Sequence, residues 1–215
     1  MPRVGMEPLR RAALIQATLE EIGARGTLDV TVGQIAKRAG VSAALAHHYF
    51  GGKEQLFLAA MRSVLDAYGA EVRQALRAAQ GPDQRLSAIL EASFSTSNFR
   101  PEIVSVWLNF YVMAQTVPEA KRLLTIYQKR LNANLVACLR PLAGARAPEI
   151  AAGAGALIDG VYLRHALSDV IPDPSASVNM VFGMIRAEIK DGAGEGLRQP
   201  HAARNISVCN SHGMG

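Results

Sequence analysis

The hydrophobic positions of this chain recur three and four residues apart almost throughout, and alternating strand patterns are scarce. This spacing is typical of amphipathic α-helices, and it predicts an all-α fold. In the first predicted helix Ile15, Leu19 and Ile22 share one face, and Gly23 and Gly26 are expected to end the helix.

Two short helices joined by a tight turn follow, and together they have the layout of a helix-turn-helix. Thr31 is a good N-cap for the earlier helix, and Ser42 is the N-cap of the later one, directly after the turn at Gly40. The later helix directs Val41 and Leu45 inward. Its opposite face, small enough to enter a major groove about 12 Å wide, consists of Ala43, Ala44, Ala46 and His47.

The remaining periodic segments predict six longer helices, which makes about nine in all. These six are Lys53–Ala79, Asp83–Ser97, Pro101–Gln115, Pro118–Leu142, Pro148–Val170 and Pro174–Lys190. We therefore expect a three-helix N-terminal domain over residues 1–52 and a larger helical domain over residues 53–190. Residues 191–215 are rich in glycine and lack the periodicity, so they are expected to form a mobile tail.

Composition and charge are those of an ordinary globular protein with a mildly basic N-terminal third. Hydrophobic residues make up 49% and charged residues 19% of the chain. The formal net charge is +5, and residues 1–62 hold eight Lys/Arg against five Asp/Glu. This bias fits a surface that faces phosphates.

Several classes of protein are disfavoured. The longest apolar run, Ile103–Ala114, is interrupted by Asn109 and is shorter than the roughly 20 residues that cross a bilayer, and the charged N-terminus lacks a signal-peptide core. Cys138 and Cys209 have no partner at metal-ligand spacing, so we expect a cytoplasmic protein with no metal or other cofactor. An enzyme is the weaker hypothesis because no phosphate-binding loop or Ser/His/Asp arrangement is present.

The segment GVSAALAHHYFGGKEQL, from Gly40 to Leu56, resembles the signature of the TetR family of transcriptional regulators. In that signature a Gly-Val-Ser turn precedes the recognition helix, and a Phe-x-x-Lys segment follows it. The resemblance implies a DNA-binding regulator with an N-terminal helix-turn-helix and a C-terminal helical domain that binds a ligand and dimerises.

The resemblance also implies roles for the matching positions. Thr31 and Lys53 would grip backbone phosphates, and Tyr49 would contact phosphate or base. Phe50 would pack the end of the recognition helix into the core. The residues that would face base edges are Ser42, Ala43, Ala44 and His47.

The chain departs from the family pattern at two places. His47, His48 and Tyr49 stand where the family often has two tyrosines and a histidine. Gly51 and Gly52 replace a more polar pair. The operator sequence of relatives is therefore not transferable to this chain.

Three further basic residues of this region have two interpretations each. Helical spacing favours His48 as a packed core residue over a DNA contact. Lys37 and Arg38 are either solvated or in contact with phosphates. We include Lys37 among the candidate DNA contacts.

An aromatic cluster marks the second domain. Trp107, Phe110 and Tyr111 lie three and four residues apart, so they can share one face of a helix. Tyr127 and Tyr162, from the two helices that follow, could complete a ring. Composition alone allows two interpretations, an ordinary core or a ligand cage.

Three segments resemble the BetI-type branch of the TetR family, whose members repress choline uptake and glycine betaine synthesis and respond to choline. They are MPRVGMEPLRR at the start, VWLNFYVMA in the aromatic helix and LIDGVYLRHAL from Leu157 to Leu167. The resemblance implies that aromatic faces hold a quaternary ammonium, each worth about 0.5–2 kcal/mol. The candidates are Trp107, Phe110, Tyr111, Tyr127 and Tyr162, with Asp159 either as a nearby carboxylate or as a structural hydrogen-bond partner.

An apolar inducer, such as a drug or a fatty acid, is the alternative for a regulator of this family. An aromatic pocket with no buried carboxylate beside it would favour that alternative. The sequence therefore makes Asp159 the residue whose surroundings distinguish the two ligand classes.

The last two predicted helices are the candidates for a homodimer interface. Residues 151–156, AAGAGA, allow close helix approach. The apolar stripe of the last helix consists of Val178, Val181, Phe182 and Ile185. A two-fold dimer would set two recognition helices about 34–36 Å apart on a palindromic operator.

Overall fold

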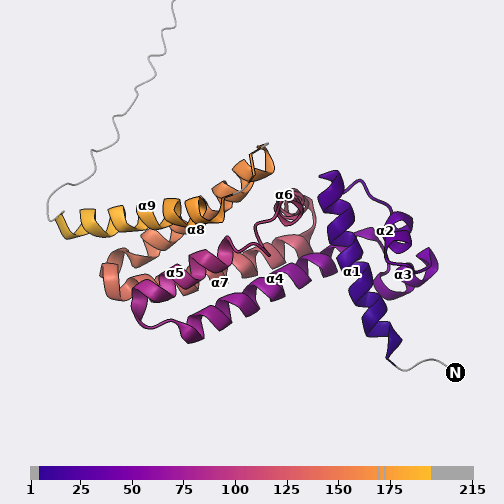
Figure 1. Cartoon of the computed structure of the whole chain (residues 1–215), viewed down its shortest axis with the longest axis horizontal. Coiled ribbons are helices and arrows are strands. Elements are labelled where there is room, and N and C mark those ends of the chain that lie inside the picture. The colour runs from indigo at the N-terminus through magenta and orange to yellow at the C-terminus, as the bar shows by residue number, and fades with distance from the viewer. Residues whose placement is uncertain (1–4, 169, 172, 195–215) are drawn as a thin grey trace, which may run out of the picture.

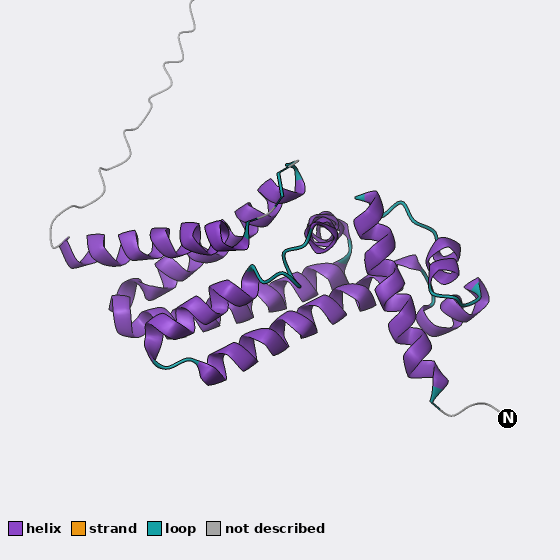
Figure 2. Cartoon of the chain, in the orientation of Figure 1, coloured by secondary structure: helices purple, strands orange, loops and turns teal. Residues whose placement is uncertain are grey.

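The computed structural model describes residues 5–168, 170–171 and 173–194, and within them every regular element is a helix (Figure 2). The all-α prediction is therefore confirmed. The α-helices are α1 (Met6–Arg25), α2 (Val32–Arg38), α3 (Ala43–Phe50), α4 (Lys53–Ala78), α5 (Gly81–Ser93), α6 (Pro101–Thr116), α7 (Pro118–Ala143), α8 (Ala147–Ala166) and α9 (Pro174–Gly194), and one 3-10 turn, η1 (Gly144–Arg146), joins α7 to α8.

Most helix ends agree with the prediction to within a few residues. Two helices stop four residues early, α5 at Ser93 and α8 at Ala166. The predicted tail differs at its start, because α9 continues through residues 191–194, and the rest of it, with Cys209, lies outside the described residues. In the described segments no helix combines the length and the apolar character needed to cross a bilayer.

The first three helices form a head at one end of the molecule, and the later helices form an elongated body (Figure 1). Helix α1 stands between the pair α2 and α3 on one side and α6 on the other. Leu14, Ile22, Ile35 and Phe57 are at most 2% exposed and join α1, α2 and α4 in one core. Burying each such side chain stabilises the fold by roughly 1.5–3 kcal/mol, so the head is packed firmly against the start of α4.

Two helices connect the head to the body. Helix α4 begins beside the head and runs for 26 residues, roughly 39 Å, into the body, where it packs against α5 and α7. Helix α6 crosses α1 closely at Gly23, where an added Cβ would lie 2.5 Å from the Cβ of Glu102. Near that crossing, Asn109 Nδ2 donates to the carbonyl of Gly26 at 3.1 Å.

Three expectations about individual positions are wrong. Gly23 lies inside α1, and the helix ends only at Gly26, whose φ of 68° is left-handed. Ala46, expected on the outer face of the recognition helix, is 1% exposed, whereas His48, expected in the core, is exposed. The eight-residue α3 packs on the head through the face that contains Ala46, and His48 therefore turns to solvent.

The expected dimer stripe on α9 is also wrong in part. Val181 and Ile185 are fully buried within the chain, where α9 packs on α5 and α8. A helix that packs on its own domain and also on a partner has one apolar face for each. The sequence pattern did not show which apolar residues of α9 belong to which face. The large apolar side chains that remain exposed on these helices are Leu163, Leu167 and Met180.

The Gly23→Ala variant tests the crossing of α1 and α6. Alanine is favoured over glycine inside a helix by about 1 kcal/mol, but here its methyl group overlaps the Glu102 side chain and its Cα, which lies 2.9 Å away. We expect a net loss of about 1–3 kcal/mol of unfolding free energy, measured by denaturant titration. Gly160→Ala is the matched control, because no atom lies within 4 Å of a Cβ there. A stabilised Gly23→Ala protein would contradict the close crossing.

Candidate DNA-reading surface and ligand cavity

Local capping determines where the two helices of the helix-turn-helix begin. Thr31 Oγ1 accepts from the backbone N–H of Gln34 at 3.2 Å, and Gln34 Oε1 accepts from the N–H of Thr31 at 2.8 Å. This reciprocal capping box satisfies two backbone donors at the start of α2. Ser42 Oγ likewise accepts from the N–H of Leu45 at 3.2 Å and starts α3.

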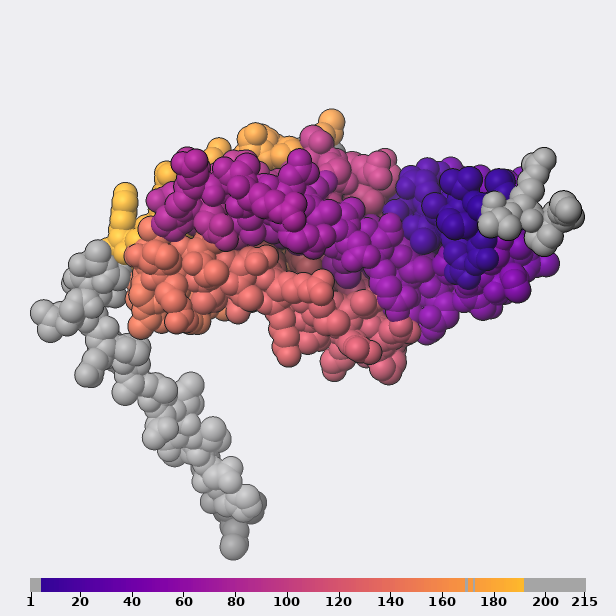
Figure 3. Space-filling model, turned by 90° about the horizontal axis from the view of Figure 1, so that it is seen from below, coloured from indigo at the N-terminus to yellow at the C-terminus, as the bar shows by residue number. Residues whose placement is uncertain are grey.

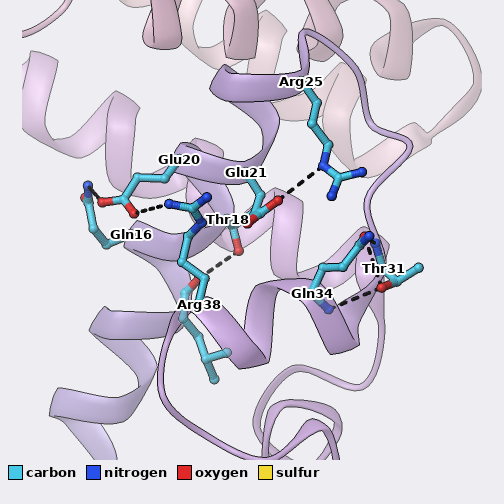
Figure 4. A network of polar contacts seen from close by, with 9 residues as sticks. Gln16, Thr18, Glu20, Glu21, Arg25, Thr31, Gln34 and Arg38 are labelled. Carbon is cyan, nitrogen blue, oxygen red and sulfur yellow. Dashed lines mark hydrogen bonds and ion pairs between the residues drawn. The ribbon is translucent and has the colours of Figure 1, made fainter.

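An ionic network fastens α2 to α1 (Figure 4). The Glu21 carboxylate of α1 accepts from Arg38 Nε at 2.6 Å and from Arg25 Nε at 3.2 Å, and Arg38 also reaches Glu20. The hydrogen bond from Arg38 lowers the pKa of Glu21. Arg38 is thus engaged within the head, which favours a structural role for it over phosphate binding. Lys37, its neighbour, is exposed.

The outer face of α3 carries small side chains, as the sequence predicts. Ser42, Ala43, Ala44 and His47 are all exposed on it. His47 Nδ1 lies 3.0 Å from the carbonyl of Gly51, and because a carbonyl only accepts, Nδ1 carries the proton. In the neutral ring Nε2 is then an acceptor, which suits a base-edge donor such as the amino group of adenine or cytosine.

Arg11 is a contributor that the sequence reasoning missed. Its guanidinium lies 5.0 Å from the ring centroid of Tyr49 and 5.2 Å from that of Phe50, and its Nη1 donates to the Tyr49 carbonyl at 2.9 Å. Arg11 on α1 therefore holds the end of the recognition helix.

The two neighbouring positions that the sequence singled out have different surroundings. Phe50 packs against the core as expected. Lys53 is exposed and its Nζ donates to the Leu28 carbonyl at 3.2 Å.

The aromatic residues predicted for the second domain do come together. The Trp107 ring centroid lies 4.8 Å from that of Tyr127, 5.8 Å from that of Tyr111 and 6.1 Å from that of Tyr162. Phe110 is fully buried beside Trp107, at 5.9 Å. Their helices, α6, α7 and α8, thus meet at one aromatic cluster in the body.

This cluster encloses a cavity of about 10 Å³, room for roughly one water molecule. Three of the lining residues were not singled out from the sequence: Tyr68 on α4, Ser93 at the end of α5 and Asn98 in the loop after it. No motif surrounds these positions. The residues that line the cavity are Tyr68, Ser93, Asn98, Trp107, Tyr127 and Tyr162. Phe110 and Tyr111 lie outside this lining and support it.

The tyrosine hydroxyls are tied into the surrounding protein. Tyr162 Oη donates to the carbonyl of Ser93 at 2.5 Å, and Tyr68 Oη lies 3.1 Å from Ser93 Oγ. Burial raises the pKa of Tyr68 to about 12, and it also raises the pKa of Tyr111, Tyr127 and Tyr162. These phenols are therefore neutral at physiological pH, and their ring faces remain electron-rich.

Asp159 on α8 lies outside the lining of the cavity. It lines a groove of about 250 Å³ between α7 and α8 and places a carboxylate at the edge of the aromatic cluster. Its Oδ1 accepts from Tyr111 Oη at 2.9 Å. Burial raises the pKa of Asp159, and hydrogen bonds from Tyr111 and Gln128 oppose that shift. A partly desolvated negative charge next to aromatic faces is an arrangement that stabilises a bound cation.

A larger groove adjoins the cavity. It lies between α4 and α7, which are neighbours on the face shown in Figure 3, and has a volume of about 520 Å³. Tyr68 and Tyr127 line both spaces, and their ring centroids are 5.8 Å apart. These two side chains therefore border both the small cavity and the larger groove.

A capped helix-turn-helix on an all-helical body with an internal aromatic cavity defines a class of protein, the ligand-responsive DNA-binding transcriptional regulators. Two family models match the chain: "Bacterial regulatory proteins, tetR family" over residues 14–60 and "BetI-type transcriptional repressor, C-terminal" over residues 82–190. The chain belongs to the TetR family of transcriptional repressors, with a C-terminal domain of the BetI type.

Curated relatives agree over almost their whole length. The chain is 50% identical over 190 residues to the HTH-type transcriptional regulator BetI of Brucella suis strain ATCC 23445, a match that covers 88% of this chain and 96% of that protein. It is 49% identical over 196 residues to the regulator of the same name from Agrobacterium fabrum strain C58, covering 89% and 95%. These relatives are transcriptional regulators, and the chain is accordingly a DNA-binding repressor and not an enzyme.

Solved structures share the fold. A transcriptional regulator from Pseudomonas aeruginosa PAO1 superposes with a TM-score of 0.74 at 28% identity, covering 87% of this chain and 93% of that one. A regulator from Saccharomonospora viridis, solved in complex with choline, superposes with a TM-score of 0.76 at 20% identity, covering 84% and 97%. At that identity the second likeness establishes the fold alone.

We expect the double variant His47→Ala/Tyr49→Ala to weaken operator binding by about tenfold or more, because each good base or phosphate contact is worth about 1–3 kcal/mol. A gel-shift titration measures the affinity. Thr125→Ala on the exposed face of α7 serves as the control, and sedimentation reports the assembly state. Unchanged affinity in a correctly folded double variant would count against α3 as the reading helix.

We expect Asp159→Asn to stabilise the ligand-free protein near neutral pH. The raised pKa means that the fold disfavours the ionised form, so stability falls as the pH rises through that pKa, and an amide avoids this loss while still accepting from Tyr111. Denaturant titrations at pH 7.5 should show a gain of roughly 0.5–2 kcal/mol. The gain should shrink as the pH is lowered, because the raised pKa lets the carboxyl take up its proton earlier than a free aspartate does. A variant less stable than the wild type at pH 7.5 would contradict the desolvated carboxylate.

Proposed function

We propose that this repressor controls genes for choline uptake and for the oxidation of choline to glycine betaine, and that choline is its inducer. The observation that carries the proposal is the aromatic cavity beside Asp159, in a chain half identical to regulators named BetI. Such a regulator works in the bacterial cytoplasm, where its operator lies. A regulator of the same fold that was solved with choline adds support.

The chemistry of the cavity suits a quaternary ammonium. Such a cation has no N–H to donate, so aromatic faces bind it better than hydrogen-bond acceptors do. We assign the faces to Trp107, Tyr127, Tyr162 and Tyr68, which line the cavity. We assign the compensating charge to Asp159, which lies outside that lining and accepts from Tyr111. Phe110 and Tyr111 support the ring of Trp107 and the carboxylate of Asp159. An apolar inducer would leave that half-buried carboxylate without a counter-charge, which is why choline is the better candidate.

Binding requires the cavity to expand. About 10 Å³ is far below the roughly 300 Å³ of a small ligand pocket. Separation of Tyr68 from Tyr127 would join the cavity to the groove between α4 and α7 and provide both the volume and an entry path. Because Tyr68 stands on α4, this opening would act directly on a helix that continues to the head.

We assign residues 1–52 to DNA reading and residues 53–190 to ligand binding and dimerisation. On α3 the base-facing residues are Ser42, Ala43, Ala44 and His47, with phosphate contacts from Thr31, Lys37, Tyr49 and Lys53. The apolar surface for a two-fold partner consists of Leu163 of α8, which is 45% exposed, Leu167 directly after α8, which is 73% exposed, and Met180 of α9. Such a dimer would read a palindromic operator with half-sites about 34–36 Å apart.

Helix α6 is the second path from ligand to DNA. Trp107 faces the cavity, whereas Glu102 and Asn109, roughly 140–160° around the helix from it, face α1. A shift of Trp107 on ligand binding therefore moves the support of the head. The inducer acts by its difference in affinity for two head spacings, one that fits the operator and one that does not.

We expect choline to weaken operator binding of the wild type by about 5- to 150-fold, the usual range of such coupling. The Trp107→Ala variant should bind operator normally but lose most of this response, because the cation loses its best aromatic face. Fluorescence of Trp107, the single tryptophan, reports binding directly. Val112→Ala, exposed on the same helix, is the matched control.

Two results would contradict the proposal. The choline assignment fails if millimolar choline neither changes Trp107 fluorescence nor releases operator. The cage assignment fails if choline releases the Trp107→Ala variant as readily as it releases the wild type.

A further inference from the structure

Asn98, in the loop between α5 and α6, is a polar residue that lines the cavity, and its backbone carbonyl accepts from Tyr162 Oη at 3.3 Å. Asn98 is 5% exposed and lines the cavity directly. Its Nδ2 donates to Glu71 Oε2 at 2.7 Å, to the Ala92 carbonyl at 3.1 Å and to Ser95 Oγ at 3.1 Å. The nitrogen of this amide is therefore committed to acceptors of the protein.

The carboxylate of Glu71, on α4, fixes which way this amide points. It also accepts from Ser95 Oγ at 2.9 Å and from Ser97 Oγ at 2.6 Å, so its position is held by the same loop. A carboxylate can only accept hydrogen bonds, and Asn98 cannot turn its oxygen toward Glu71 without repulsion. The side-chain atom through which Asn98 can bond a ligand is consequently its Oδ1, an acceptor.

We propose that Glu71 is a positioning residue that makes the cavity select a quaternary ammonium alcohol over the corresponding zwitterionic carboxylate. The inference rests on the proposed function and specifies the selectivity of the same site. The hydroxyl of choline donates to Asn98 Oδ1. The carboxylate of glycine betaine has no donor and brings oxygen against the oxygen of Asn98. The six residues that line the cavity include no basic side chain, and the arginines of the adjoining groove, Arg62, Arg73 and Arg130, are not part of that lining.

Two negative charges flank this cavity and act in the same direction. Asp159 lies behind Tyr111 on the α8 side, and Glu71 lies behind Asn98 on the α4 side. A cation is attracted by both charges, and the extra carboxylate of a zwitterion is repelled by both. The repressor thus responds to the alcohol that enters the oxidation and not to the acid that leaves it.

Calorimetric titration of the full-length wild type and of Glu71→Gln with choline and with glycine betaine tests the proposal. A site built to accept from a hydroxyl discriminates strongly against an analogue that lacks the donor. We expect wild type to bind choline at least 100-fold more tightly than glycine betaine. In Glu71→Gln the new amide can donate to Asn98 Oδ1, so the Asn98 amide can turn over, and we expect the ratio to fall at least tenfold, chiefly through tighter binding of glycine betaine.

Three further measurements sharpen the test. Ser97→Ala, at an exposed position, removes one donor to Glu71 and should narrow the ratio partially, which keeps the test informative if Glu71→Gln folds poorly. Glu91→Gln removes an exposed carboxylate on α5 that lines neither the cavity nor the groove, and it should leave the ratio unchanged. Ethyltrimethylammonium, which lacks the hydroxyl, should bind wild type at least tenfold more weakly than choline.

The outcomes separate the two proposals. If wild type binds choline but Glu71→Gln and Ser97→Ala keep the wild-type ratio, or lose both ligands equally, Glu71 has only a structural role and the inference is overturned. If wild type binds choline and glycine betaine with equal affinity, the selectivity is absent and the inference is again overturned. If wild type binds none of the three quaternary compounds, the proposed function itself fails, and this inference fails with it.

Discussion

The close packing of α1 on α6 is the contact on which the rest of the molecule depends. Gly23 allows the two helices to approach until no side chain fits between them, and Asn109 fixes the end of α1 by its bond to Gly26. Without this approach the head would be attached through α4 alone. With it, the head rests on two helices that both reach the aromatic cluster, through Tyr68 on α4 and Trp107 on α6.

Because the head rests on α4 and α6, its orientation depends on how the side chains around the cavity are packed. Interiors are packed too densely to deform continuously, so a change in ring positions is transmitted as a shift of whole helices. Within the head the Glu21 network and the Arg11 contacts hold α2 and α3 to α1. These contacts hold the head together as a unit, so in the proposed dimer a ligand would change the spacing between the two heads.

The sequence predicted those features that depend on neighbouring residues. The caps at Thr31 and Ser42 are visible because a cap is decided within three positions of the chain. His48 and Ala46 were misplaced because the packing angle of a short helix is set by its partners, and periodicity over eight residues leaves that angle open. Glu71 and Asn98 had no detectable signal, since their contact joins positions 27 residues apart through a loop.

The candidate site contains several buried polar groups, and hydrogen bonds within the protein explain why the fold tolerates them. In the free protein the aromatic rings contact one another, and the hydroxyls of Tyr68 and Tyr162 find partners on Ser93, so little is left unsatisfied. A ligand must replace those ring contacts with better ones. A neutral apolar molecule offers the rings only contacts of the kind they already have, and it leaves Asp159 desolvated without a counter-charge. A quaternary cation adds an attraction to the ring faces and to that carboxylate which the empty site lacks, and this difference is the free energy available to move the helices.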